Sequence, residues 1–276
     1  MKGDRISEPR RRSPRQPTTL AAGAVAILAT ADPAAKADAS RRLAETWRSG
    51  ELLVGSATAP LRPARPARPL LCLPKEMPKR RGFGSIAGRV ALLHALTHIE
   101  LNAIDLGWDI VARFSGEPLP REFFSDWARV ASEEAAHFGL LARRLADFGA
   151  CYGDLPAHDG LWEAALATAG DLLARLAVVP LALEARGLDV TPEMIDRLER
   201  VGDTRSADLL RVIYRDEIGH VATGLRWFDY LCRARDLVPE EVFQDRIRRY
   251  HRGGLKPPFN VAARTAAGFP ARYYGA

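Results

Sequence analysis

The chain has 276 residues, a formal net charge of +6 and an apolar content of 47%. This length is enough for one large domain with a buried core. No apolar stretch reaches the length of a membrane-spanning helix, which argues against a membrane protein. Three scattered cysteines form no C-x-x-C motif and no even disulfide set. They fit a reducing compartment, and we expect a cytoplasmic protein.

Residues 1–17 form a tail rich in arginine, proline and serine, which we expect to be disordered. The first 16 residues hold six basic and two acidic side chains and so contribute +4 of the net charge. Because the remainder of the chain is nearly balanced, the charge is no strong signal for nucleic-acid binding.

The next segment, 18–50, is predicted to be helical. It opens with an apolar run over 20–31, which also resembles a secretory signal with a loose cleavage site before Asp32. We favour an alanine-rich helix that continues, after a short break, into a second helix. Leu43 and Trp47 are spaced to lie on the packing face of this second helix.

Residues 51–82 contain so many prolines that they can be neither a helix nor a central strand. We expect an extended strap that crosses the surface of a helical bundle. An arginine and proline tract of this kind also suits contact with an acidic partner or nucleic acid, and this alternative stays open.

A bundle of long helices is predicted over 83–252. The first three of its helices span 85–114, 120–148 and, from Asp159, about 159–187. Pro180 lies inside the third helix and should kink it, either as an ordinary bend or to aim the following Glu184.

The rest of the bundle follows a predicted break between Gly187 and Pro192, where Thr191 and Pro192 read as a new helix start. The fourth long helix is expected at 204–235, and a basic helix at 239–251 completes the domain. Residues 253–276 are predicted to form an extended tail over the surface.

Two E-x-x-H motifs lie in the second and fourth predicted helices. One pairs Glu134 with His137, and the other pairs Glu217 with His220. Residues three apart share a helix face, and each pair stands among apolar residues. Carboxylates on a buried face are costly unless they are paired, so the motifs indicate a shared polar site.

Glu100 and Glu184 each place one carboxylate on the apolar face of the other two helices. Glu100 precedes Glu134 by 34 residues and Glu184 precedes Glu217 by 33, so the bundle reads as two similar halves. Glu184 lies level with Glu217 along the bundle axis only if the helix over 192–201 continues in the same direction as the one before it. One Glu from each of two helices and one E-x-x-H from each of two others is the ligand set of a ferritin-like dinuclear bundle.

The predicted metals are two iron ions, with manganese as the alternative. Four carboxylates offset the +4 charge of two divalent ions, and two neutral imidazoles complete the set. Oxygen-rich sites with some imidazole and no thiolate suit these metals. The competing interpretation is that some of the glutamates lie on the surface or are protonated in the core. The predicted ligands are Glu100, Glu134, His137, Glu184, Glu217 and His220.

Supporting positions are predicted for five further side chains: His94, His98, Asp105, Tyr214 and Asp216. The two histidines do not share the helix face of Glu100, which favours packing or a supporting role over metal binding. The two aspartates are candidates to orient the ligand histidines, although each is more often a solvated helix residue. Tyr214 is a candidate redox-active tyrosine or an ordinary helix residue.

These motifs, with the runs RPARPLLCLPKEMPKR and RLAVVPLALEARGLDVTP, resemble an uncharacterised bacterial family described only as ferritin-like domain-containing proteins. The similarity covers roughly residues 18–250. It implies an all-α fold, a ferritin-like four-helix bundle with extra terminal helices and the strap. By analogy it also implies the dinuclear site at the six predicted ligands. It implies no particular reaction, because fold does not fix function.

Within that superfamily we expect an oxygen-activating diiron oxidase or hydroxylase of unknown substrate. One relative in kind is the diiron tRNA hydroxylase that acts on an isopentenylated adenosine, so a small-molecule and a tRNA substrate both stay open. A non-enzymatic metal-binding or stress-protection protein is the alternative. An interaction protein with a silent site is disfavoured by the intact ligand set. No motif indicates the electron donor or the oligomeric state.

Overall fold

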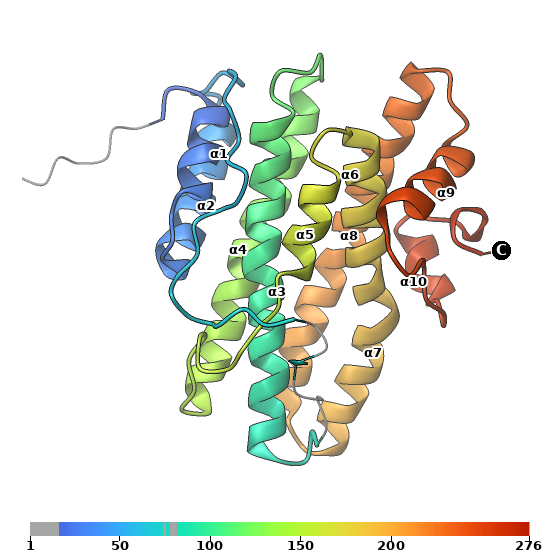
Figure 1. Cartoon of the computed structure of the whole chain (residues 1–276). Helices are drawn as coiled ribbons and strands as arrows, with labels where there is room; N and C mark the ends of the chain where they lie inside the picture. The colour runs from blue at the N-terminus through green and yellow to red at the C-terminus, as the bar shows by residue number, and fades with distance from the viewer. Residues whose placement is uncertain (1–16, 74–75, 78–81, 276) are drawn as a thin grey trace, which may run out of the picture.

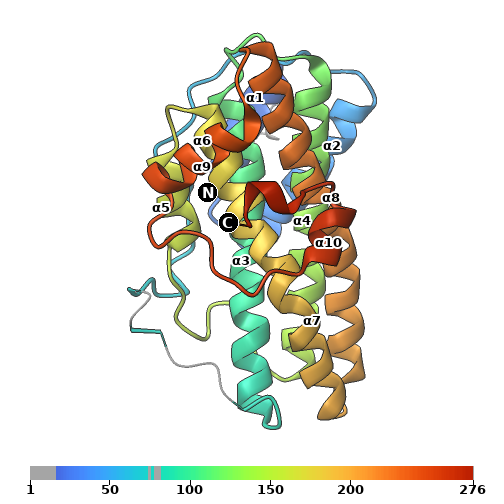
Figure 2. The ribbon, with the colours of Figure 1, turned by 90° about the vertical axis from the view of Figure 1, so that its right-hand side faces the viewer.

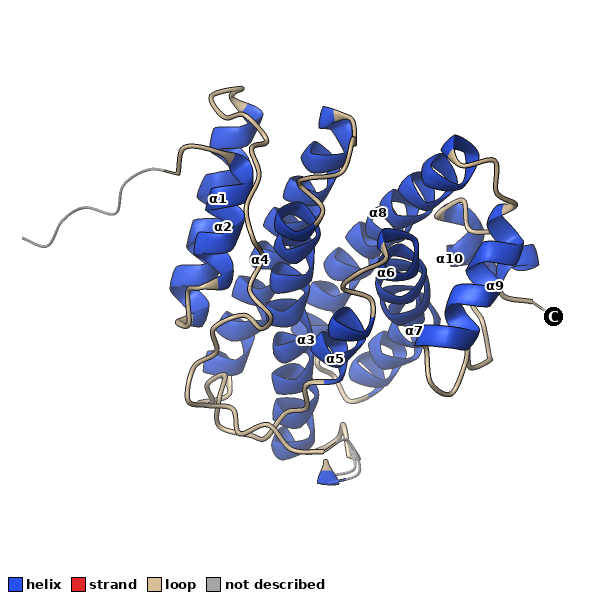
Figure 3. Cartoon of the chain, turned by 45° about the horizontal axis from the view of Figure 1, so that its top comes forward, coloured by secondary structure: helices blue, strands red, loops and turns tan. Residues whose placement is uncertain are grey.

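The computed structural model describes residues 17–73, 76–77 and 82–275, and within them the chain is all-helical. Figure 3 shows helices and loops only, and the described pairing of extended backbone is limited to isolated bridges, Thr19 with Leu53 and Leu71 with Ala157. The predicted all-α class is therefore confirmed. Among the described residues, no helix is both long and apolar enough to cross a membrane. The predicted tail lies, apart from Pro17, outside the described residues.

Four helices form the centre of the molecule and run alongside one another (Figure 1). They are α3 (Ile86–Arg113), α4 (Arg121–Asp147), α7 (Ala185–Arg200) and α8 (Thr204–Ala234). α3 packs along α4, α7 packs along α8, and α4 meets α8 across the middle. Side chains cap two of these helices. Ser85 Oγ accepts a hydrogen bond from the Gly88 amide at 3.1 Å, and Asp203 Oδ1 accepts one from the Ser206 amide at 3.1 Å.

The N-terminal helices α1 (Leu20–Leu28) and α2 (Pro33–Arg48) pack against α3 and α4 on one side of the molecule (Figure 1). The chain breaks between them where predicted, and Asp32 Oδ1 caps α2 by accepting from the Ala35 amide at 2.7 Å. The apolar run is part of the core, and Leu43 and Trp47 are buried as predicted.

Residues 51–73 of the predicted strap contain no helix, while 74–75 and 78–81 lie outside the described residues. The arginines of the strap bind acidic groups of the bundle. Arg62 forms ion pairs with Asp159 and Glu163, and Arg65 binds Asp105. These charges fix the strap to the chain's own helices.

The segment before α7 departs from one continuous helix. It is divided into α5 (Gly160–Ala167), α6 (Leu172–Val178) and the π-helix η2 (Val179–Glu184), which leads directly into α7. The third predicted helix does begin after Asp159, but the Asp159 side chain makes no capping hydrogen bond.

The predicted break between Gly187 and Pro192 is wrong, because α7 runs through both residues without interruption. Pro192 has no amide hydrogen for the carbonyl of Leu188, four residues earlier. That carbonyl instead accepts a hydrogen bond from Asn260 Nδ2 at 3.2 Å. A side chain from the C-terminal segment therefore compensates for the proline, and the continuous helix meets the condition for Glu184 to reach the height of Glu217.

The C-terminal elements are α9 (Pro239–Tyr250), α10 (Val261–Ala266) and the short 3₁₀ helix η3 (Ala271–Tyr273). Figure 2 shows them on the face formed by α6, α7 and α8. The prediction of an extended tail over 253–276 is wrong, because α10 and η3 lie within this segment. Phe269 and Tyr273 are buried and pack around Phe243 of α9, so burial of aromatic side chains folds this segment onto the core.

Candidate metal centre

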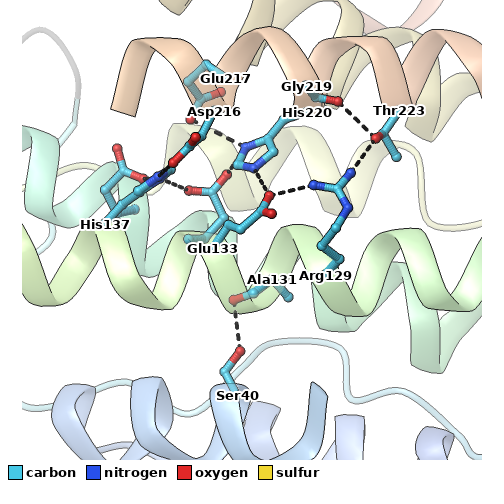
Figure 4. A network of polar contacts seen from close by, with 12 residues as sticks. Ser40, Arg129, Ala131, Glu133, His137, Asp216, Glu217, Gly219, His220 and Thr223 are labelled. Atoms are coloured by element: carbon cyan, nitrogen blue, oxygen red, sulfur yellow. Dashed lines mark hydrogen bonds and ion pairs between the residues drawn. The ribbon is translucent and has the colours of Figure 1, made fainter. Parts of the chain in front are cut away.

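The two E-x-x-H motifs face each other from α4 and α8, as Figure 4 shows. A carboxylate of α3 joins them from a third helix. One oxygen or nitrogen from each of Glu100, Glu134, His137 and Glu217 lies within 4.8 Å of all the others. The fold therefore brings together four of the six predicted ligands as one compact group.

Glu134 stands between the two imidazole rings. Its Oε2 is 3.3 Å from His137 Nδ1, and its Oε1 is 2.9 Å from His220 Nδ1. His137 Nδ1 is also 3.4 Å from Glu100 Oε2, and His220 Nδ1 is 3.6 Å from Glu217 Oε1. Both histidines thus present the same ring nitrogen to the carboxylates.

Several atoms of this cluster are buried but have no hydrogen-bond partner in the described chain. Buried polar atoms without a partner are rare in folded proteins and cost about 1–3 kcal/mol each. The short approach of His220 Nδ1 to Glu134 does not have hydrogen-bond geometry. Oxygen and nitrogen donors left free in this way fit a pair of hard or borderline metal ions. The atoms without a hydrogen bond are Glu100 Oε2, Glu134 Oε1, Glu184 Oε2 and His220 Nδ1, of which all but Glu184 Oε2 lie within ion-pair distance of a neighbouring group.

Glu184 ends the π-helix η2 and lies outside the most compact group. Burial raises its pKa, and the charges of Glu217 and Glu134 raise it further, so its carboxyl group interacts electrostatically with the cluster. The approach of η2 depends on Gly224 of α8, because a Cβ at this position would lie 2.5 Å from Pro180 Cβ. The sequence predicts a distortion at Pro180, and the structure has a π-helix there. A π-turn inside a helix is common at functional sites.

The pKa values of the cluster diverge. Burial raises the pKa of Glu100 and Glu217, and the Glu134 charge raises both further. Burial would raise the pKa of Glu134 too, but His220 and His137 outweigh it and hold that pKa well below its usual range. Burial opposes the charged form of His137, yet Glu100 and Glu134 raise its pKa to about 11. A proton on His137 thus offsets part of the carboxylate charge when no metal is bound, and metal ions would replace it.

The outer nitrogens of both histidines contact a second pair of carboxylates. His137 Nε2 is 3.0 Å from Asp216 Oδ2, and His220 Nε2 is 2.8 Å from Glu133 Oε2 (Figure 4). Asp216 is among the predicted supporting residues, whereas Glu133 is not predicted. A signal for it exists, because an acidic residue directly precedes the Glu of both motifs.

Glu133 is held in turn by Arg129. The guanidinium donates to Glu133 Oε2 at 2.6 Å and to Thr223 Oγ1 of α8 at 2.9 Å. Hydrogen bonds of this kind set the tautomer and the ring orientation of a ligand histidine.

His94 and His98 lie on α3 but face the loop 151–158. His94 Nε2 accepts a hydrogen bond from the Gly153 amide at 2.9 Å. His98 Nδ1 is 2.8 Å from the Tyr152 hydroxyl, and both histidine rings stack on this tyrosine. Their contacts fix a loop to α3.

Asp105 and Tyr214 also have partners away from the cluster. Asp105 binds Lys36 Nζ at 2.6 Å and Arg65, and both Lys36 and Asp105 are buried. The Tyr214 hydroxyl accepts from Asn260 Nδ2 at 3.1 Å. These two side chains therefore connect α3 and α8 to the N- and C-terminal segments.

The fold and this cluster define an all-helical protein with a buried carboxylate and imidazole centre. The chain belongs to the family described as "Protein of unknown function (DUF455)", whose model matches residues 29–275. It is 44% identical over 208 residues to an uncharacterized protein of Haemophilus influenzae, and the match covers 73% of this chain and 71% of that protein. No solved structure matches. The predicted resemblance to a family of unknown function is confirmed.

Proposed function

We propose that this chain is a ferritin-like dinuclear metal protein, with iron as its metal, that acts as an oxygen-activating oxidase or hydroxylase. The observation that carries the proposal is the group of buried ligand atoms on Glu100, Glu134, Glu184 and His220 that converge without making hydrogen bonds. They come from α3, α4, η2 and α8, which matches one Glu from each of two helices and one E-x-x-H from each of two others.

The six predicted ligands would hold two ions. Glu134 would be central among them, since its two oxygens face different histidines. When bound, an iron pair in such a carboxylate site supplies the chemistry of oxygen activation. The chain itself keeps the ligands in a largely dry pocket, with Glu100 and His137 buried. Asp216 and Glu133 orient the two imidazoles from outside.

A catalytic role is favoured over storage by what surrounds the central helices. α1 and α2 cover α3 and α4, and α9 and α10 pack on α6, α7 and α8. This differs from a compact cage subunit, whose bundle surface must be free for assembly. A cavity of about 680 Å³ beside α2 and α4 has Glu133 in its wall, next to His220. Its volume lies in the range of small-molecule sites.

Oxygen uptake under repeated turnover tests the proposed activity. The protein is loaded anaerobically with ferrous iron, and oxygen consumption is followed with ascorbate as the reductant. An oxidase or hydroxylase continues to consume oxygen after the iron present at the start has been oxidised. Uptake that stops after a single stoichiometric oxidation, with iron retained, contradicts the enzymatic part and favours metal buffering. The Glu134→Ala variant should show neither behaviour.

A further inference from the structure

A second cavity, of about 200 Å³, is lined by residues of η2, α7 and α10 and by residues between 251 and 259. Its wall includes Ala182 and Leu183 of η2, the segment that ends at Glu184. None of the six predicted metal ligands lines it. The metal-centre proposal therefore does not account for this cavity.

Cationic side chains dominate the wall. Arg186, Arg252, Lys256 and Arg264 face one carboxylate, Asp189, which gives a formal charge of +3. Among the described residues, no carboxylate forms an ion pair with Arg252 or Lys256, and both side chains are exposed. Four cations that share one carboxylate repel one another, so an anion in the cavity would be stabilised.

Asp189 does not supply the missing counter-charge, because other donors already bind it. Arg264 Nε and Nη2 contact its two oxygens at 2.9 and 2.8 Å, and the Asn260 amide donates to it at 2.9 Å. Arg264 is only 1% exposed, and its third nitrogen, Nη1, is buried without a hydrogen-bond partner. The guanidinium packs on the rings of Phe259, Phe269 and Tyr274, and a ligand oxygen at Nη1 would remove the cost of its unsatisfied donor.

We propose that this cavity binds the phosphate group of a small anionic ligand, either free phosphate or a phosphomonoester. Phosphate carries the charge that the cations lack, and its oxygens suit the planar fork of arginine. Leu255 and Phe259 add apolar wall that can contact the remainder of a phosphomonoester. Burial lowers the pKa of His251, with Lys256 acting in the same direction, so this residue is not counted among the cations.

Isothermal titration calorimetry of the full chain tests the proposal. Inorganic phosphate and glycerol 3-phosphate are titrated at constant ionic strength, with acetate as the comparison anion. We expect saturable binding of at least one phosphate compound at one site per chain and much weaker binding of acetate. In the double variant Arg252→Gln/Lys256→Gln the affinity should fall by about tenfold or more, because two charge-assisted contacts are lost. Which compound binds more tightly separates free phosphate from a phosphomonoester.

The matched control is the double variant Arg42→Gln/Arg200→Gln, which removes the same charge from exposed positions on α2 and α7 outside the cavity. Its phosphate affinity should equal that of the unmodified chain. The proposal is overturned if neither phosphate compound binds, if acetate binds equally well, or if both double variants lose the same affinity. Thermal unfolding of both variants should match the unmodified chain, because none of the four side chains is buried.

Discussion

His137 of α4 donates a hydrogen bond from Nε2 to Asp216 Oδ2 of α8, at 3.0 Å and across 79 positions of sequence. The other motif makes the equivalent contact in the opposite direction. His220 of α8 contacts Glu133 of α4 at 2.8 Å. The acidic residue that precedes each motif therefore orients the histidine of the other motif. This exchange holds α4 against α8 and turns both Nδ1 atoms toward the carboxylates (Figure 4).

Removal of Asp216 should weaken metal binding without loss of the fold. The Asp216 side chain is 40% exposed, so Asp216→Ala creates no large cavity. Its loss frees the His137 ring and lowers its basicity, and we expect a 10- to 100-fold (order of magnitude) decrease in iron affinity. Anaerobic titration with ferrous iron gives the measurement. Asp208→Ala, an exposed change on the same helix, is the control and should leave the affinity unchanged.

Metal binding should release protons and tighten as pH rises. The pKa of His137 is raised to about 11, so this residue binds a proton at neutral pH in the metal-free protein, and burial raises the pKa of Glu217, which favours its protonated form. These protons must leave before the metal binds, and a higher pH removes part of that cost. Calorimetric titrations near neutral pH in two buffers of different ionisation enthalpy count the protons. An affinity that is constant or falls as pH rises contradicts the assignment of these residues as ligands.

Gly224→Ala should disturb the position of η2. The added Cβ would lie 2.5 Å from Pro180 Cβ and 2.6 Å from Pro180 Cγ, so α8 and η2 must separate. We expect a loss of about 1–3 kcal/mol in the free energy of unfolding, typical of overpacking. Because η2 carries Glu184, iron affinity should fall as well. Urea unfolding and iron titration measure the two effects.

Gly219→Ala is the matched control for this change. It is the same substitution on the same helix, and its Cβ would meet nothing within 4 Å. The replacement of a helical glycine by alanine should leave stability unchanged or raise it by up to about 1 kcal/mol. Equal destabilisation by both variants would show that the contact with Pro180 is not the cause.

Removal of one partner of the buried ion pair between Lys36 and Asp105 should strongly destabilise the fold. Burial lowers the pKa of Lys36 and raises that of Asp105, so each charged form depends on the other, whereas Arg65 supports only the charged form of Asp105. Lys36→Met leaves Asp105 with Arg65 alone, and we expect a loss of about 3 kcal/mol in the free energy of unfolding. In the double variant Lys36→Met/Asp105→Leu most of that loss should be recovered. A double variant as unstable as the single one would show that packing, not charge, dominates.

The long helices α3, α4 and α8 could be predicted closely from the sequence. Ser85 and Asp203 cap two of them, and the apolar positions repeat with a helical period over many turns. The same periodicity placed Glu134 and His137 on one buried face. These features are local, so they can be read without knowledge of tertiary contacts.

Other features depend on contacts that are distant in sequence. Pro192 is tolerated inside α7 because Asn260, 72 positions from Leu188, binds the freed carbonyl. The C-terminal aromatic residues Phe269 and Tyr273 are buried because they pack against Phe243 of α9. Glu133 is hard to distinguish from a solvated helix residue until α8 brings His220 to it. In each case the partner lies on another element, where a local pattern carries no information.

Metal content is the most direct test of the central claim. The protein is purified aerobically, and a second sample is reconstituted anaerobically with ferrous iron before unbound metal is removed. We predict about two iron or manganese ions per chain, as for other bundles with this ligand set. Glu134→Ala and Glu217→Ala should lose them while the helical circular dichroism is kept, and the exposed Glu122→Ala on α4 should retain them. A chain that binds no metal after anaerobic reconstitution would contradict the dinuclear centre.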